Sequence, residues 1–69
     1  MNSVLNNDFE KVYTVPEVAL MLKMHPDSVR RLIRAKKMEA MKITRDWRIT
    51  HSMLKKFYSE YLKYPMKEI

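Results

Sequence analysis

The feature that most constrains the fold of this chain is Pro26, which stands between two segments with helical spacing of apolar residues. The residue before a proline is biased away from the α-helical region, so a first helix must end before Pro26. Residues 23–25 (KMH) are left for a turn, with His25 as an N-cap candidate and Pro26 as the first residue of a second helix. The sequence therefore predicts two helices joined by a very short turn.

The first helix is predicted to begin at residue 14. Thr14 is an N-cap candidate, Pro16 suits the first turn, and Glu17 follows Thr14 by three residues, as a capping box requires. At 100° per residue the apolar positions share one face, and they are Val15, Val18, Ala19 and Leu22.

The second helix is predicted to run to about Ala35 or Lys36, with apolar residues on one side and arginines on the other. Val29, Leu32 and Ile33 form the stripe expected to be buried. The opposite face has the spacing i, i+3, i+4, i+7 and consists of Asp27, Arg30, Arg31 and Arg34.

After residue 37 the spacing changes from helical to alternating, which predicts a two-stranded hairpin over residues 39–43 and 47–50. Trp47 and Ile49 share strand parity and are expected to face the core, while Arg48 faces outward. The chain contains no glycine. Of the turn residues, Asp46 is the best suited to a left-handed conformation.

A final helix is expected from Thr50, as N-cap, to about Leu62 or Lys63, ending before Pro65. The order helix, turn, helix, hairpin, helix describes a mainly α domain with a small β-hairpin, a winged helix-turn-helix. We expect residues 13–64 to form this domain, between a flexible arm (1–12) and a frayed tail (65–69). The apolar stripe of the last helix is Leu54, Phe57, Tyr58 and Tyr61.

The net charge of +6 is concentrated in one segment. Residues 30–48 contain eight basic and two acidic residues, whereas the rest of the chain contains six lysines and six acids. A basic block on a neutral background is typical of a nucleic-acid binder, and the second helix of a helix-turn-helix enters the major groove. Double-stranded DNA is therefore the expected partner.

We expect Arg30, Arg31 and Arg34 to contact DNA rather than form a solvated face, because arginine binds both guanine edges and phosphates. Asp27 and Ser28, in the first turn, either read bases or cap the helix. Arg45, at the hairpin tip, is the candidate wing residue for the minor groove or a phosphate. Lys42 and Arg48, on the strands, are candidate phosphate contacts. Lys36 and Lys37 are further candidates, although complementing the dipole at the end of the second helix explains these two lysines equally well.

Other functions find little support in the sequence. There is no cysteine, no glycine-rich phosphate loop and no paired-carboxylate motif, and the two histidines stand apart, so no enzyme, cofactor or metal site is expected. No signal sequence and no membrane-spanning segment is predicted, and a cytoplasmic location is expected. Trp47 is assigned to the core rather than to base stacking. Leu20 and Met21 fall away from the predicted core and form a candidate protein-contact patch.

Three short motifs in this order resemble the excisionase-type DNA-binding domains, small relatives of the MerR-like winged helices: TVPEVA (14–19), SVRRLIR (28–34) and WRI (47–49). The resemblance covers roughly residues 13–57. The chain departs from the family pattern at the usual wing glycine, which is Thr44 here, and at Leu20, where the family often has a polar residue.

The resemblance implies a recognition helix at about 26–36 and a wing at 39–50. It also implies cooperative binding of repeated sites, bending of DNA, and assistance to a tyrosine-type integrase in excising a mobile element. A small transcriptional regulator of a phage, plasmid or integrative element would use the same contacts. A third possibility is a protein-interaction adaptor whose basic face meets an acidic partner.

Overall fold

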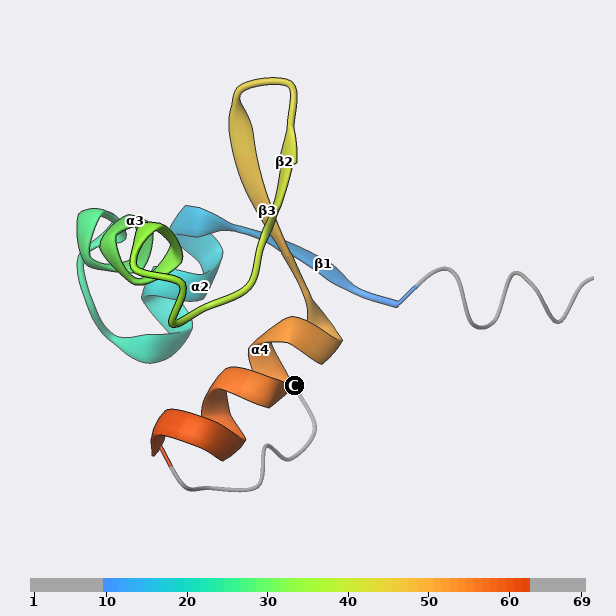
Figure 1. Cartoon of the computed structure of the whole chain (residues 1–69). Helices are drawn as coiled ribbons and strands as arrows, with labels where there is room; N and C mark the ends of the chain where they lie inside the picture. Colours follow the sequence, from blue (N-terminus) through green and yellow to red (C-terminus); the bar gives the residue numbers. More distant parts are fainter. Residues whose placement is uncertain (1–9, 63–69) are drawn as a thin grey trace, which may run out of the picture.

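The computed structural model describes residues 10–62, which form three helical segments and a small antiparallel sheet (Figure 1). The predicted order of helix, helix, hairpin and helix is confirmed, and one short strand precedes it. In chain order the elements are β1 (Val12–Thr14), α2 (Val15–Leu22), α3 (Pro26–Arg34), β2 (Met41–Ile43), β3 (Asp46–Thr50), α4 (His51–Phe57) and a π-helical segment, η1 (Tyr58–Leu62).

Each helix begins at the cap that the sequence predicts. Thr14 and Glu17 form a capping box: the Glu17 amide donates to Thr14 Oγ1 (3.2 Å) and the Thr14 amide donates to Glu17 Oε1 (2.8 Å). His25 Nδ1 accepts from the Asp27 amide at 3.0 Å at the start of α3. Thr50 Oγ1 accepts from the Met53 amide at 3.2 Å at the start of α4. Local hydrogen bonding thus defines all three helix starts.

The turn between α2 and α3 depends on a left-handed lysine. Lys23 adopts φ 58° and ψ 48°, and this reversal lets the Met24 amide donate to the Ala19 carbonyl at 2.9 Å. A left-handed residue after a helix normally satisfies the last free carbonyl groups in this way. The turn occupies residues 23–25, as predicted, and it leaves α3 packed against α2.

The sheet has the strand order β1-β3-β2, and both neighbouring pairs are antiparallel. Tyr13 lies opposite Ile49, and Lys42 lies opposite Trp47. The alternating pattern of the sequence predicts β2 and β3 but not β1, since three residues are too few to show such a pattern. Residues 10–12 were expected in the flexible arm, but they contact β3 and the start of α4. The rest of the predicted arm (1–9) and the predicted tail (65–69) lie outside the described residues.

The hairpin turn differs from the prediction. Its loop has two residues, Thr44 and Arg45, and Thr44 has the positive φ of 54°, whereas Asp46 lies in β3 opposite Ile43. A two-residue hairpin loop needs a positive φ at its first position to match the twist of the strands. That position is Thr44, and Asp46 lies outside the loop. The hydroxyl of Thr44 donates to the carbonyl of Ile43.

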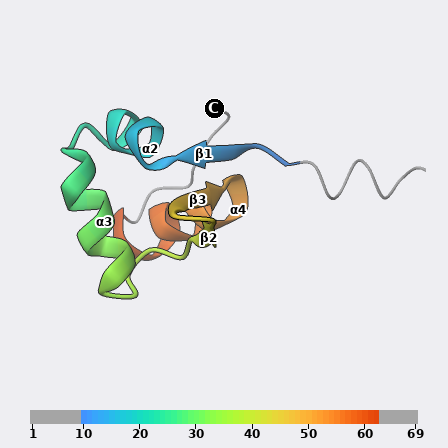
Figure 2. The same ribbon diagram turned by 90° about the horizontal axis from the view of Figure 1, so that it is seen from above.

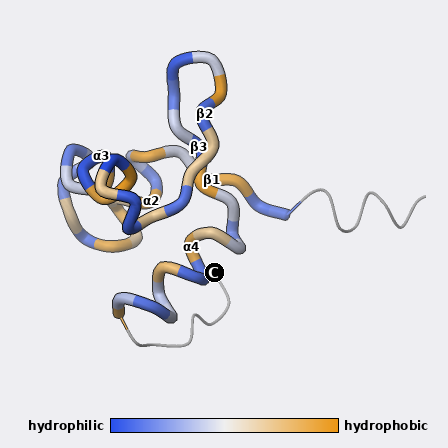
Figure 3. Tube along the Cα trace, in the orientation of Figure 1, coloured by the Kyte–Doolittle hydropathy of each residue, from blue (hydrophilic) through white to orange (hydrophobic). Residues whose placement is uncertain are grey.

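One continuous core lies where the helices meet the sheet, and Figure 3 shows hydrophobic and hydrophilic residues alternating along α3 and α4. Trp47 is half-buried and packs against this core beside the fully buried Ile49, as their shared parity predicts. Tyr61, expected in the apolar stripe, is 47% exposed because the π-helical turn of η1 shifts it from that stripe. The buried residues are Tyr13, Val15, Val18, Ala19, Val29, Ile33, Met38, Ile49, Leu54 and Phe57.

Candidate DNA-binding surface

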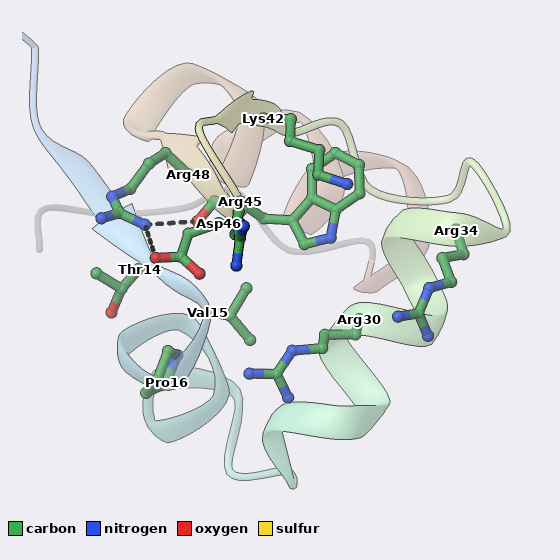
Figure 4. A pocket seen from close by; sticks show the side chains of 10 residues that line it. Thr14, Val15, Pro16, Arg30, Arg34, Lys42, Arg45, Asp46 and Arg48 are labelled. Atoms are coloured by element: carbon green, nitrogen blue, oxygen red, sulfur yellow. Dashed lines mark hydrogen bonds and ion pairs between the residues drawn. The ribbon is translucent and has the colours of Figure 1, made fainter.

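A basic groove lies between α3 and the β2–β3 hairpin, and the start of α2 closes one end of it (Figure 4). Its volume is about 410 Å³. In Figure 1 the hairpin projects from the body of the molecule beside the two helices, as a wing does. Ten residues line the groove: Thr14, Val15, Pro16, Arg30, Arg34, Lys42, Arg45, Asp46, Trp47 and Arg48.

Five cationic side chains and one carboxylate line this groove. Arg30 and Arg34 come from α3, one helical turn apart, and the other three cations come from the wing. The fold therefore brings two basic segments that are separated in the sequence to the walls of a single channel. Opposing walls of one sign concentrate positive potential between them, which favours a polyanion.

The arginines of the groove differ in how firmly they are held. Arg30 Nη1 lies 2.9 Å from Asp27 Oδ1, and this ion pair fixes the direction of its guanidinium. Arg48 Nη1 donates to the Trp47 carbonyl at 3.1 Å and lies 3.9 Å from Asp46 Oδ2. Within residues 10–62, Arg34 and Arg45 pair with no carboxylate. These two cations are the most available to an incoming phosphate.

Lys42 is positioned by an aromatic ring. Lys42 and Trp47 are directly opposite each other on β2 and β3, and Lys42 Nζ lies 5.1 Å from the centre of the Trp47 ring. Trp47 thereby serves both the core and the groove: one side packs against buried residues and the ring also supports a cation of the channel wall.

The remaining predicted contact residues lie outside the groove. Ser28, Arg31 and Lys37 line a shallow hollow of about 320 Å³ on the other side of α3. Asp27 is exposed beside Arg30, and Lys36 is exposed near the end of α3. The sequence pattern placed Arg31 with Arg30 and Arg34, whereas α3 presents them on two separate edges.

Five groove residues were not among the sequence-based candidates for DNA contact: Asp46 and Trp47 in the wing, and three residues before and at the start of α2. Thr14, Val15 and Pro16 lie at the junction of β1 and α2, and they close the end of the channel nearest Arg48. The capping pattern of Thr14 indicated a helix start, but only the pairing of β1 with β3 brings that start to the wing.

The candidate protein-contact patch is reduced to one residue. Leu20 is 80% exposed, whereas Met21 is half-buried and packs against the core. Met21 is partly buried because the face of α2 that packs against the core is wider than the apolar stripe of the sequence indicated.

Two hydrogen-bonded contacts outside the groove shift pKa values. Hydrogen bonds from the Ser52 side chain and amide to Glu10 Oε1, both 2.8 Å, hold the pKa of Glu10 below its ordinary value of 4.5. The 2.7 Å hydrogen bond to Glu39 raises the pKa of Lys56 above 10.5. The first contact ties the chain before β1 to the start of α4, and the second ties α4 to the α3–β2 connection.

Residues 10–62 contain no cluster of three or more side chains suited to a metal ion. In the same described part of the chain, no helix combines the length and apolar character needed to span a bilayer.

Residues 12–61 match the family described as helix-turn-helix domain, so the chain belongs to that family. The match spans both α2 and α3 as well as the wing and α4. The three helices with their three-stranded sheet are consistent with a winged helix-turn-helix, and membership implies DNA as the partner. Neither the search of curated proteins nor that of solved structures found a match.

Proposed function

We propose that this chain is an excisionase, or recombination directionality factor, which binds and bends double-stranded DNA for a tyrosine-type integrase. In this proposal α3 enters the major groove and reads base edges, and the wing follows the neighbouring phosphates. The major groove is about 12 Å wide and admits one helix. The phosphodiester strand that borders it then lies in the channel between α3 and the wing.

The single observation that carries this proposal is the groove itself. A helix in the major groove and a hairpin beside it must straddle one DNA strand, and here the space between them is lined by five cations. Arg34 and Arg45 stand on opposite walls without carboxylate partners in residues 10–62, so both are free to bind phosphates.

The second edge of α3 extends the proposed contact beyond the groove. Ser28 and Arg31 lie on that edge, Lys37 follows the helix and lines the same hollow, and Asp27 stands at the start of the helix. We assign Asp27 and Ser28 to base edges, because first-turn residues of a recognition helix reach the floor of the groove. Arg31, Lys36 and Lys37 then bind base edges or the phosphates on the far side.

The small size of the domain supports an architectural role. A single DNA-binding module buries about 600–1,000 Å² of protein surface, which limits the specificity of one copy. Several copies on adjacent sites, together with an integrase, would supply the rest, and the DNA must bend to bring distant sites together. In this proposal the protein acts in the cytoplasm, on the DNA of the nucleoid.

The test begins by selecting preferred sites from a pool of random duplexes. A selected duplex of about 30 base pairs, labelled at both ends, then reports bending by energy transfer between the labels. An architectural factor shortens the end-to-end distance and stimulates excision by a tyrosine integrase in vitro. Specific binding that leaves the DNA straight and excision unchanged would contradict the excisionase role and favour a transcriptional regulator.

A further inference from the structure

The wing carries an exposed isoleucine next to its tip. Ile43 is the last residue of β2 before the two-residue loop, and its side chain is 47% exposed. It belongs neither to the buried core nor to the partly buried residues that pack against the core. Figure 3 shows this hydrophobic segment of β2 close to the tip of the wing. Single exposed apolar residues are common on protein surfaces, but this one lies on the element that flanks the DNA-binding groove.

The side chain of Ile43 lies on the face of the hairpin away from the core. Side chains alternate between the two faces of a strand. Lys42 is paired with Trp47, which packs against the core, so Met41 and Ile43 share the opposite face. Met41 is also exposed, and neither apolar residue lines the groove between α3 and the wing. The outer face of β2 is therefore an apolar surface that adjoins the basic groove.

The charges around this apolar surface favour DNA as the molecule that covers it. Residues 41–50 contain three basic residues and one acid. Arg45 follows Ile43 by two residues and pairs with no carboxylate within residues 10–62. The acid, Asp46, lies 3.9 Å from Arg48 Nη1, which offsets its charge. A duplex suits both the cations and the isoleucine, because its minor groove has a negative potential and its stacked bases accept apolar side chains.

The proposed docking of α3 brings the outer face of the wing to the minor groove. Each strand of a duplex borders the major groove on one side and the minor groove on the other. With α3 in the major groove and one strand in the channel, the wing stands on the minor-groove side of that strand. Ile43, next to the tip, then faces the base pairs through the minor groove.

We propose that Ile43 inserts between two neighbouring base pairs from the minor groove and kinks the duplex there. Apolar side chains that enter the minor groove in this way, isoleucine among them, kink DNA by about 20–90°. Arg45, beside the inserted side chain, binds the adjacent phosphate. This inference rests on the proposed function and deepens it, because it assigns the side chain that bends the DNA.

Insertion also gives the wing a sequence preference of its own. Separating two base pairs costs least at pyrimidine–purine steps, which are TA and CA/TG. The minor groove that the wing enters lies half a helical turn, roughly five base pairs, from the centre of the α3 contact. Preferred sites should therefore contain a flexible step at a fixed distance from the bases that α3 reads.

The first experiment selects binding sites from random duplexes with wild type and with Ile43→Ser. Wild type should enrich a pyrimidine–purine step at one position, and Ile43→Ser should lose that preference while keeping the bases selected by α3. Val12→Ser is the matched control, because Val12 is equally exposed (48%) and shares the outer face of the sheet, but lies on β1. It should keep both preferences.

The second experiment observes insertion directly, with 2-aminopurine placed at the selected step. Its fluorescence rises when the base loses its stacking neighbour, so it should rise with wild type and with Ile43→Leu, which keeps an apolar side chain. It should stay at the level of the free duplex with Ile43→Ser. Energy transfer between labels at the duplex ends should report a kink of about 20–90° in the first two cases only. Circular dichroism verifies that each variant is folded.

The outcomes separate this inference from the proposed function. Absence of DNA binding by the wild type would overturn the proposed function itself. Equal bending by wild type and Ile43→Ser, or no rise in fluorescence with the wild type, would overturn the insertion alone. Loss of the bend in Val12→Ser as well would assign the effect to the sheet as a whole and would also overturn it. Because Ile43 carries no charge, Ile43→Ser should leave the slope of log K against log salt unchanged, and a shallower slope would contradict the assigned role.

Discussion

Thr44 has a backbone conformation that its side chain disfavours. Its φ of 54° lies in the left-handed region, in a chain that contains no glycine. A left-handed residue other than glycine costs roughly 1–2 kcal/mol, and β-branched residues are especially unusual there. The cost is tolerated because the two-residue loop keeps Arg45 at the tip of the wing.

Thr44→Gly is therefore expected to stabilise the domain by up to about 1 kcal/mol, after the larger chain entropy of glycine is subtracted. For a domain of this size the melting temperature should rise by about 4–8 °C per kcal/mol. Thermal unfolding followed by circular dichroism measures the change. Arg45→Gly serves as the control, because Arg45 does not have a positive φ and should lose stability. Destabilisation by Thr44→Gly would show that the left-handed turn carries no strain.

Glu10 is expected to make stability depend on pH. Its pKa is lowered by the hydrogen bonds from Ser52, so the carboxylate stabilises the folded state. For a lowered pKa this contribution is complete above the unfolded value of 4.5 and is lost as the pH falls through the folded value. Chemical denaturation of wild type and Glu10→Gln should show a stability difference at pH 7 that disappears in acid. A difference that is unchanged by pH would exclude the carboxylate as its source.

At the scale of secondary-structure elements, the helices were predictable and the sheet was predictable only in part. Each helix starts at an N-cap side chain that bonds to an amide no more than three residues away, so a short stretch of sequence is enough to predict it. These N-caps are Thr14, His25 and Thr50. Strand β1 depends on its pairing with β3, more than thirty residues away, which no local pattern expresses. The same limit applies to the turn, because loop length rather than residue preference selected Thr44 over Asp46.

The candidate site shows the same division. The spacing of Arg30, Arg31 and Arg34 predicts that they lie away from the core, because the helical period of 3.6 residues places them opposite the apolar stripe. That Arg30 and Arg34 face the wing while Arg31 lines another hollow depends on where the hairpin packs. The contribution of Thr14 and Pro16 to the groove likewise needs the tertiary structure.

The capping box of α2 connects stability to the site, because Thr14 also lines the groove. Thr14→Ala should destabilise the domain by about 0.5–2 kcal/mol, the usual effect of losing an N-cap hydroxyl. Thr14→Ser keeps the hydroxyl and should preserve most of the stability. Urea denaturation measures both variants, and equal losses would argue that packing of the threonine methyl, rather than capping, stabilises the helix.

At the scale of the whole molecule, the distribution of charge defines the DNA-binding surface. All of the net charge of +6 arises within residues 30–48, and the fold turns this one segment into two walls of a channel. The neutral remainder supplies most of the core, the helix starts and the hydrogen bonds between Glu10 and Ser52, and Ile33 and Met38 are the fully buried residues that the basic segment adds. This separation allows the DNA-binding residues to be changed without loss of the fold.

The measurement that tests the central claim most directly is the salt dependence of DNA affinity, followed by fluorescence anisotropy with a labelled duplex. Five groove cations predict a slope of log K against log salt of about −4.5 or steeper. Arg34→Ala with Arg45→Ala should bind more weakly and reduce the slope by about 2, whereas the exposed Lys55→Ala on α4 should leave it unchanged. Equal slopes for all three proteins, or no binding by the wild type at low salt, would contradict the account.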